Sequence, residues 1–231
     1  MEKPKIVSRA EWTAARRKLL EKEKEFNRQR DALSAERRKL PMVKVDKKYV
    51  FEGSNGKETL FDLFAGKRQL IVYHFMFDPS WEAGCKSCSY LADTFDGASR
   101  HLPARDTAFV AISRAPLAKL EAFKKRMGWK FKWLSSFGGD FNYDFHVSFK
   151  PGDKDAEYNY SNQGFPESEG PGMSVFYRDG DEVFHAYSTY SRGLDLLIGT
   201  YNYLDHTPLG RNEQELKYGM SWVRHHDKYD A

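Results

Sequence analysis

Two cysteines, Cys85 and Cys88, are the residues whose type and spacing point most directly to chemistry. They form a C-x-x-C pair between an apolar stretch typical of a buried strand and a stretch typical of a helix. A helix N-terminus offers unpaired N–H groups and a partial positive charge, and both favour a thiolate at Cys85. Lys86 adds a nearby cation. Because Cys88 lies one helical turn further, we expect Cys85 to attack a disulfide and Cys88 to resolve the mixed disulfide.

Two other uses of the cysteine pair stay open at this level. Both thiols could be reduced structural residues of a core. They could also form half of a zinc site, with His74, His101 or His225 assisting. Zinc needs four ligands, however, and the sequence has no second C-x-x-C and no closely spaced histidine pair that completes the set. The spacing therefore favours a redox-active dithiol.

The elements around the cysteines alternate between strand and helix. The pattern predicts a buried strand over residues 69–77, a helix over 85–100, a strand over 107–112 and a helix over 116–127 that ends at Gly128. Such a β-α-β-α order favours a parallel pair of strands. Arg114 follows the second strand, at the carboxyl edge where α/β sites gather, and is a candidate to hold an anion or a thiolate near Cys85; the alternative is a surface arginine.

The remainder of the chain predicts a hairpin and a tail. Residues 173–177 and 182–187 flank a turn and form the hairpin, and a final amphipathic helix spans 193–204. Residues 129–170 are rich in aromatics, glycine and aspartate, so we expect an insertion of loops and short strands there. The polar tail, 205–231, carries the cluster His225-His226-Asp227, which we expect to be solvated.

Residues 8–40 predict one long helix. Ser8 followed by Glu11 forms a capping box, and Pro41 stops the helix. Large apolar residues recur every seven positions, at Trp12, Leu19, Phe26, Leu33 and Leu40. Only Ala15 supports this stripe at a second heptad position, whereas a stable coiled coil prefers two apolar residues per heptad. We expect an arm that packs on the body or on a second subunit, and the stripe also suits a homodimer.

Composition and charge exclude several classes of protein. The 231 residues are 40% hydrophobic and 30% charged, which is ordinary globular usage. The net charge of +4 is concentrated in residues 9–40, where acidic residues interleave with basic ones, so we expect no nucleic-acid partner. The longest apolar run is eight residues, 70–77, and no apolar signal segment opens the chain, so we expect a cytoplasmic protein without a membrane partner.

These motifs together resemble one family of the thioredoxin superfamily. It is a bacterial thioredoxin-like family catalogued as a domain of unknown function and described as dithiol–disulfide oxidoreductases. The resemblance covers nearly the whole chain, and the motifs that carry it lie in residues 69–77, 84–89, 112–117, 127–129, 141–142, 187–193 and 204–211. It implies an α/β thioredoxin-like fold, in which a central mixed sheet is flanked by helices. We expect an N-terminal helical arm, 1–41, and a thioredoxin-like domain, 42–231, that contains the insertion 129–170.

The resemblance also implies roles and departures. Thioredoxins keep a buried carboxylate that accepts a proton from the second cysteine, and Asp78 is the candidate here, although a solvated loop aspartate is the alternative. Thioredoxins have a tryptophan before the first cysteine, where this chain has Gly84. Their cis-proline position falls near Gly172, one residue after Pro171. The peroxiredoxin motif is also incomplete, because Glu82 stands at its Thr/Ser place.

The resulting expectation is a thiol–disulfide oxidoreductase that acts through Cys85 and Cys88 without a cofactor. Its partners would be a protein or small-molecule disulfide and a cellular dithiol that donates electrons. One alternative is a thiol peroxidase, in which Cys88 resolves a sulfenic acid formed on Cys85 by peroxide. The other alternative is a non-catalytic module of thioredoxin fold that binds a partner.

Overall fold

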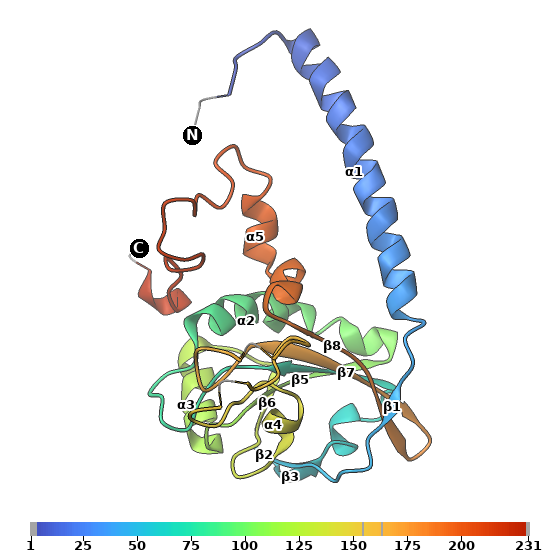
Figure 1. Ribbon diagram of the computed structural model, residues 1–231, viewed down its shortest axis with the longest axis vertical. Coiled ribbons are helices and arrows are strands. Elements are labelled where there is room, and N and C mark those ends of the chain that lie inside the picture. Colours follow the sequence, from blue (N-terminus) through green and yellow to red (C-terminus); the bar gives the residue numbers. More distant parts are fainter. Residues whose placement is uncertain (1–3, 154, 163, 230–231) are drawn as a thin grey trace.

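The computed structural model describes residues 4–153, 155–162 and 164–229, and its centre is an eight-stranded sheet (Figure 1). The strand order is β1-β8-β7-β4-β5-β6-β2-β3. The two central strands are the apolar stretches expected from the sequence, β4 (Gln69–His74) and β5 (Thr107–Ser113), and they pair in parallel from Gln69 opposite Thr107 to His74 opposite Ile112. Helix α2 (Lys86–Ala98) connects them, and α3 (Leu117–Met127) follows β5.

The predicted hairpin completes the central unit. Strand β7 (Gly172–Asp179) runs antiparallel to both β4 and β8 (Glu182–Tyr190). The order β5-β4-β7-β8, with a helix after each of the two parallel strands, is the thioredoxin arrangement. The predicted α/β thioredoxin-like fold is therefore confirmed, with helices flanking a mixed sheet (Figure 1).

The sheet extends beyond this unit on both sides. The outer strands are β1 (Val43–Lys44), β2 (Val50–Gly53), β3 (Gly56–Thr59) and β6 (Lys132–Ser135). Strand β6 pairs in parallel with β5, so the first part of the segment expected as an insertion is part of the main sheet. Helix α4 (Phe141–Asp144) follows, and the shorter 3-10 turns are η1 (Asp62–Phe64), η2 (Leu102–Arg105) and η4 (His226–Lys228).

Alternating side chains of the central strands fill two cores on opposite faces of the sheet. On β4, Tyr73 belongs to the cluster under α2 and α3, whereas Val72 belongs to the cluster on the other face. The aromatic residues of 129–149 are mainly core residues, because Trp129, Trp133 and Phe141 are each no more than 5% exposed.

The C-terminal helix differs from its prediction. In place of one helix over 193–204, the chain forms the 3-10 turn η3 (Ser191–Leu197) and the short helix α5 (Gly199–Leu204). They are separated at Ile198, whose backbone is extended with φ −87° and ψ 93°. The backbone N–H of Gly199 donates to Thr94 Oγ1 at 3.2 Å, so it bonds to α2 and does not continue a helical ladder.

The N-terminal arm is the helix α1 (Arg9–Arg37), which projects away from the sheet (Figure 1). Its capping box is formed as predicted, since Glu11 N–H donates to Ser8 Oγ and Ser8 N–H donates to the Glu11 carboxylate. Within the described ranges, no helix is long and apolar enough to cross a membrane.

Candidate active site

Cys85 is the N-cap residue of α2, at the edge of the sheet where β4 ends. Its backbone N–H donates to the carbonyl of Met76 at 3.0 Å, which ties the start of the helix to the segment that continues β4. Its carbonyl accepts hydrogen bonds from the Ser89 N–H and hydroxyl, both at 2.9 Å. These bonds fix the backbone of Cys85, and the residue as a whole is half-buried.

The two thiols have opposite electrostatics. The nearby Cys88 side chain, and then the Cys88 and Ser87 N–H groups at the start of α2, outweigh burial and lower the pKa of Cys85 to about 7. Cys88 is only 2% exposed, and burial raises its pKa well above the usual value despite a hydrogen bond with Tyr73. Both cysteines are free. The assignment of attacking and resolving roles to the two cysteines stays a prediction.

Gly84 explains why no tryptophan precedes the first cysteine. A Cβ atom at this position would lie 2.7 Å from Cε1 of Phe75 and 3.1 Å from Cε1 of Phe123. Both rings belong to the core under α2, so they have little freedom to move away. Only glycine lets the chain pass this close to the aromatic core immediately before Cys85.

The C-terminal tail packs against this same point, so the cluster His225-His226-Asp227 is solvated only in part: His226 and Asp227 are exposed as expected, but His225 is half-buried. His225 Nε2 lies 2.8 Å from the carbonyl oxygen of Gly84, and Val223 is fully buried. The Nζ atom of Lys86 lies 3.4 Å from the Ser221 carbonyl oxygen, so the cation expected beside the thiolate also contacts the tail.

Two further contacts fasten the tail to the helices. Arg126 on α3 donates two hydrogen bonds of 2.8 Å to the carboxylate of Asp227. His226 Nδ1 lies 2.7 Å from Oδ1 of Asp93 on α2. All three residues of the cluster therefore have partners that are distant in sequence, and no local pattern identifies such partners.

Asp78 and Arg114, the other two predicted site residues, do lie together. Arg114 Nη2 donates to Asp78 at 2.7 Å, while its Nε donates to Glu169 at 2.6 Å and its Nη1 to the Tyr143 hydroxyl at 2.6 Å. Asp78 also accepts hydrogen bonds from the Ser80 N–H and hydroxyl, and from the Ser168 hydroxyl at 3.0 Å. Among the described residues, these partners include neither cysteine. We call Asp78, Arg114, Glu169 and Tyr143 the arginine cluster.

The carboxylates of the arginine cluster are shifted in opposite directions. Burial alone would raise the pKa of Asp78, but hydrogen bonds from Ser80 and Ser168 and the charge of Arg114 lower it overall. Glu169 is 1% exposed, and burial raises its pKa to about 7 although Arg114 and Ser148 oppose the shift. Glu169 is not among the predicted site residues, because it lies 55 positions from Arg114 in a segment without regular structure.

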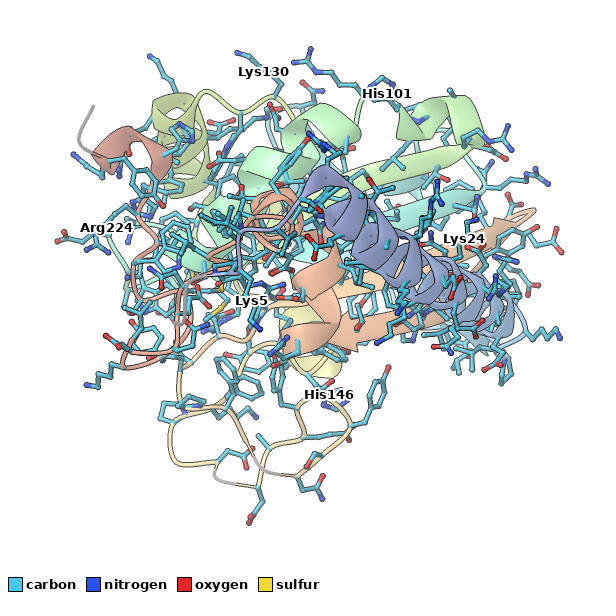
Figure 2. All side chains as sticks on the ribbon, turned by 90° about the horizontal axis from the view of Figure 1, so that it is seen from above. Lys5, Lys24, His101, Lys130, His146 and Arg224 are labelled. Carbon is cyan, nitrogen blue, oxygen red and sulfur yellow. The ribbon has the colours of Figure 1, made fainter. Side chains whose placement is uncertain are left out.

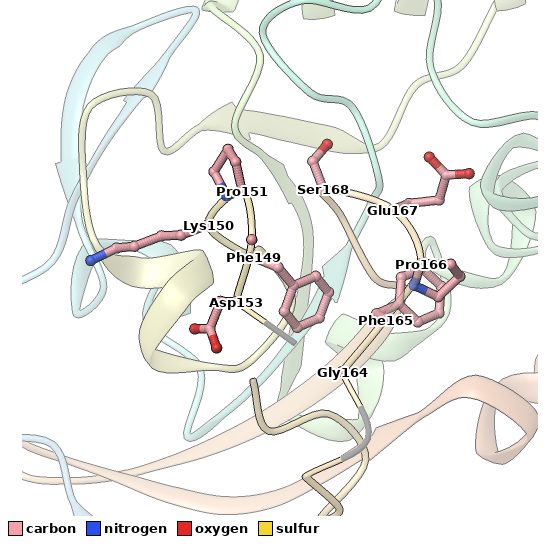
Figure 3. Close-up of a pocket in the computed structure, with 10 residues that line it drawn as sticks. Phe149, Lys150, Pro151, Asp153, Gly164, Phe165, Pro166, Glu167 and Ser168 are labelled. Atoms are coloured by element: carbon pink, nitrogen blue, oxygen red, sulfur yellow. The ribbon is translucent and has the colours of Figure 1, made fainter. Parts of the chain in front are cut away.

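A cavity of about 630 Å³ lies beside the arginine cluster, between residues 149–153 and 164–168 (Figure 3). Phe149 and Phe165 stack across it with ring centroids 5.8 Å apart. Ser168 forms part of its wall and donates to Asp78. Ser168 therefore links the wall of the cavity to the arginine cluster, and no cysteine lines the cavity.

Two features found in other thiol proteins are missing from the described part of the chain. It contains no cis peptide bond, so Pro171, immediately before β7, is trans. It also contains no group of three or more His, Cys, Asp or Glu residues placed to hold a metal ion.

Solved structures with a similar arrangement include peroxiredoxins. Peroxidoxin BcpB from Mycobacterium tuberculosis is 13% identical, with a TM-score of 0.49 over 71% of this chain and 96% of that one. The mitochondrial 2-cys peroxiredoxin from Plasmodium falciparum is 12% identical, with a TM-score of 0.45 over 71% and 95% of the two chains. A mutant of PrxQ from Xylella fastidiosa is 11% identical, with a TM-score of 0.43 over 67% and 89%.

No curated protein matches the sequence. A family match does extend over nearly the whole length, residues 1–229. The chain belongs to the family described as "Bacterial protein of unknown function (DUF899)".

Proposed function

We propose that this protein is a thiol–disulfide oxidoreductase in which Cys85 is the attacking and Cys88 the resolving thiol. The observation that carries the proposal is the opposite acidity of two adjacent thiols at one helix N-terminus. The partly exposed Cys85 has a pKa of about 7, so a large share of it is thiolate at neutral pH. The pKa of the buried Cys88 is raised well above its usual value, which keeps this thiol protonated until it is needed.

The proposed reaction has two exchange steps. The Cys85 thiolate attacks one sulfur of a substrate disulfide, forms a mixed disulfide and releases a thiolate that takes a proton from solvent. Cys88 then loses its proton to solvent and attacks the Cys85 sulfur, and the second substrate thiolate leaves and is protonated. The substrate gains two electrons and the protein retains a Cys85–Cys88 disulfide. A dithiol donor restores the reduced pair by the same exchange, so no cofactor takes part.

Asp78 and Arg114 have a supporting role in this proposal. Asp78 accepts four hydrogen bonds and its lowered pKa makes it a weak base, so we assign no proton transfer to it. Arg114 already uses its Nε and both Nη atoms on cluster partners. We propose that both residues position the carboxyl edge of the sheet beside the cysteines.

The decisive experiment is alkylation of each cysteine against pH, read by mass spectrometry, in samples equilibrated over a glutathione redox series. We expect half-maximal alkylation of Cys85 near pH 7, protection of Cys88, and a reversible loss of two protons as the disulfide forms. Cys88→Ala should raise the pKa of Cys85, because the Cys88 side chain is its main stabilising partner. Cys88→Ser should accumulate the mixed disulfide.

Three outcomes would contradict the proposal. A Cys85 pKa near the free-thiol value of about 8.5 would remove its basis. Thiols that never join at any potential would leave a partner-binding module as the better account. Oxidation of Cys85 by peroxide far faster than by disulfides would assign the protein to the thiol peroxidases, with a sulfenic acid detectable on Cys85 in Cys88→Ser.

A further inference from the structure

Helix α1 has little contact with its own chain. None of its residues is buried, and its base touches the body where the Arg37 guanidinium lies 5.8 Å from the ring centroid of Tyr187. Seen from above, the helix crosses in front of the body, with Lys24 along its length (Figure 2). Most helices in proteins are stabilised by packing of an apolar face. Helix α1 lacks such packing within its own chain, so we expect its apolar face to pack against a partner.

That face is the heptad stripe. Trp12, Leu19, Phe26 and Leu33 recur every seven residues, and each remains between 49% and 57% exposed. On a straight helix, residues spaced by seven shift gradually around the helix axis. They stay on one face toward a partner helix only when the two helices supercoil. The stripe therefore has the period of a coiled-coil seam, at the positions conventionally labelled a.

The charges beside the stripe match a second copy of the same helix. In a parallel two-stranded coiled coil, each g residue faces the e residue of the next heptad on the partner. With the stripe at a, the facing pairs are Glu11 with Arg16, Lys18 with Glu23, Glu25 with Arg30, and Ala32 with Arg37. Three pairs join opposite charges and none joins like charges, and each pair occurs twice by symmetry.

The antiparallel arrangement fits less well. The stripe would also match itself when reversed about Phe26, so apolar residues alone do not fix the direction. In that arrangement e residues face e residues, so a favourable pair of Glu23 with Arg30 is offset by a like-charge pair of Arg16 with Arg37. A like-charge contact of this kind disfavours the antiparallel arrangement relative to the parallel one.

We propose that α1 pairs with α1 of a second copy of this chain as a parallel two-stranded coiled coil. Within one chain, Arg16 binds Glu23 at 2.8 Å and Arg28 binds Glu25 at 2.5 Å, with side chains 40% to 66% exposed. Exposed pairs of this kind contribute little, so exchanging them for pairs between chains costs little. Because α1 joins the body at its C-terminal end, the two bodies lie at the same end of the coil (Figure 1).

The remaining core positions set the strength of the dimer. The d positions are Ala15, Lys22, Gln29 and Glu36. In a parallel pair each d residue faces its own copy, so Lys22 meets Lys22 and Glu36 meets Glu36, and these like charges lower the stability of the coiled coil. We therefore expect a reversible dimer whose population depends on protein concentration. The inference is independent of the thiol chemistry.

Sedimentation equilibrium of the full chain over an about hundredfold concentration range tests the pairing. The mass should rise from one chain of 26.8 kDa toward twice that value. Phe26→Lys should dissociate the dimer at least tenfold more readily, because it places a charge in the seam. Asn27→Lys introduces the same side chain on the adjacent outer position and should leave the dimer unchanged. Phe26 is 57% exposed, so neither variant should disturb the fold.

A charge exchange tests the direction. Glu25→Lys and Arg30→Glu should each weaken the dimer, because each variant faces like charge on its own copy. Mixing the two variants should restore dimers that contain one chain of each, since both facing pairs are then opposite in charge. Circular dichroism of each variant checks that α1 remains helical.

Each alternative result would overturn the proposal. A wild-type chain that stays monomeric at every concentration removes the pairing. A dimer that persists in Phe26→Lys uses another surface. A dimer that Phe26→Lys dissociates, but that the mixed charge variants do not restore, is not parallel.

Discussion

The dithiol and the arginine cluster lie at the same carboxyl edge of the sheet. Cys85 and Asp78 follow β4, and Arg114 follows β5. The two regions differ in how many of their polar groups have hydrogen-bond partners. In the arginine cluster, Arg114 donates to Asp78, Glu169 and Tyr143 over 2.6–2.7 Å. At the dithiol, Cys85 is partly exposed and its pKa is about 7, so the group can change charge near neutral pH.

The difference separates a group that holds structure from one that is available to react. A perturbed pKa occurs in both places, and structural ion-pair networks produce such shifts as readily as active sites do. The two regions differ in solvent exposure and in how far their polar groups are held by hydrogen-bond partners. Cys85 is half-buried with a buried partner thiol beside it, whereas Arg114 uses its Nε and both Nη atoms on cluster partners.

Removing the charge of Arg114 should have the largest effect on stability. Arg114→Met leaves the buried carboxylate of Glu169 and that of Asp78 without their cation, so we expect the free energy of unfolding to fall by about 3–5 kcal/mol. Urea denaturation measures the loss. Arg192→Met, at a side chain that is 86% exposed, is the control and should change stability by less than about 0.5 kcal/mol.

The Arg114→Met variant also tests whether Arg114 affects the pKa of Cys85. If the cluster is structural, the alkylation curve of Cys85 in Arg114→Met should keep its midpoint near pH 7 under conditions where the variant is folded. A midpoint raised by a full pH unit would show that Arg114 stabilises the thiolate, and the two regions would then form one site.

Glu169 should make stability depend on pH. Its pKa is about 7 in the folded protein against an ordinary 4.5, so the folded state binds a proton that the unfolded state has released between these values. This contribution is complete below about pH 4.5 and is lost as the pH rises through 7, by up to roughly 3 kcal/mol. Urea titrations at several pH values measure it.

Glu169→Gln should remove that part of the pH dependence, because the amide does not titrate. Glu167→Gln, at an exposed position two residues earlier, should keep the wild-type slope. Equal slopes for the wild-type protein and Glu169→Gln would mean that the carboxyl group does not take up a proton on folding.

Gly84→Ala perturbs the dithiol side through packing. The new methyl group would lie 2.7 Å from a ring atom of Phe75, so neighbours must shift, at a cost of about 1–3 kcal/mol. Gly97→Ala is the matched control, because nothing lies within 4 Å of that position in α2, and it should stabilise the protein by about 0.5–1 kcal/mol. Effects of the same sign in thermal unfolding would contradict the packing argument.

The smallest effect is expected where the tail meets the site. His225→Ala removes the contact with the Gly84 carbonyl and should cost about 0.5–1.5 kcal/mol. Alkylation of Cys85 should also become faster, since the cover over Gly84 loosens. His206→Ala removes a ring that is hydrogen-bonded to the nearby Asn202 carbonyl and not to Gly84, so it should leave the alkylation rate unchanged.

The central fold was predictable because its signals are local. The apolar strands, the capping box at Ser8 and the stop at Gly128 depend on neighbouring residues, and each appears in the structure. The α2 N-terminus was predictable for the same reason, since a C-x-x-C pair between a strand and a helix places the first cysteine at the cap.

The surroundings of the dithiol were less predictable because they depend on distant partners. Glu169 reaches Arg114, and His225 reaches Gly84, across 55 and 141 positions. The break at Ile198 likewise depends on a bond from Gly199 to Thr94 in another helix. Tertiary contacts decide such features, and no periodicity in the chain reports them.

The cover that the tail places over α2 has a consequence for biosynthesis. Residues 221–227 leave the ribosome long after Cys85 and Cys88, because synthesis proceeds from the N-terminus. Until these residues have emerged, Val223 cannot be buried and His225 cannot bind Gly84. During that interval the tail does not cover the start of α2, so we expect oxidants in the cell to reach the two thiols more easily than in the finished protein.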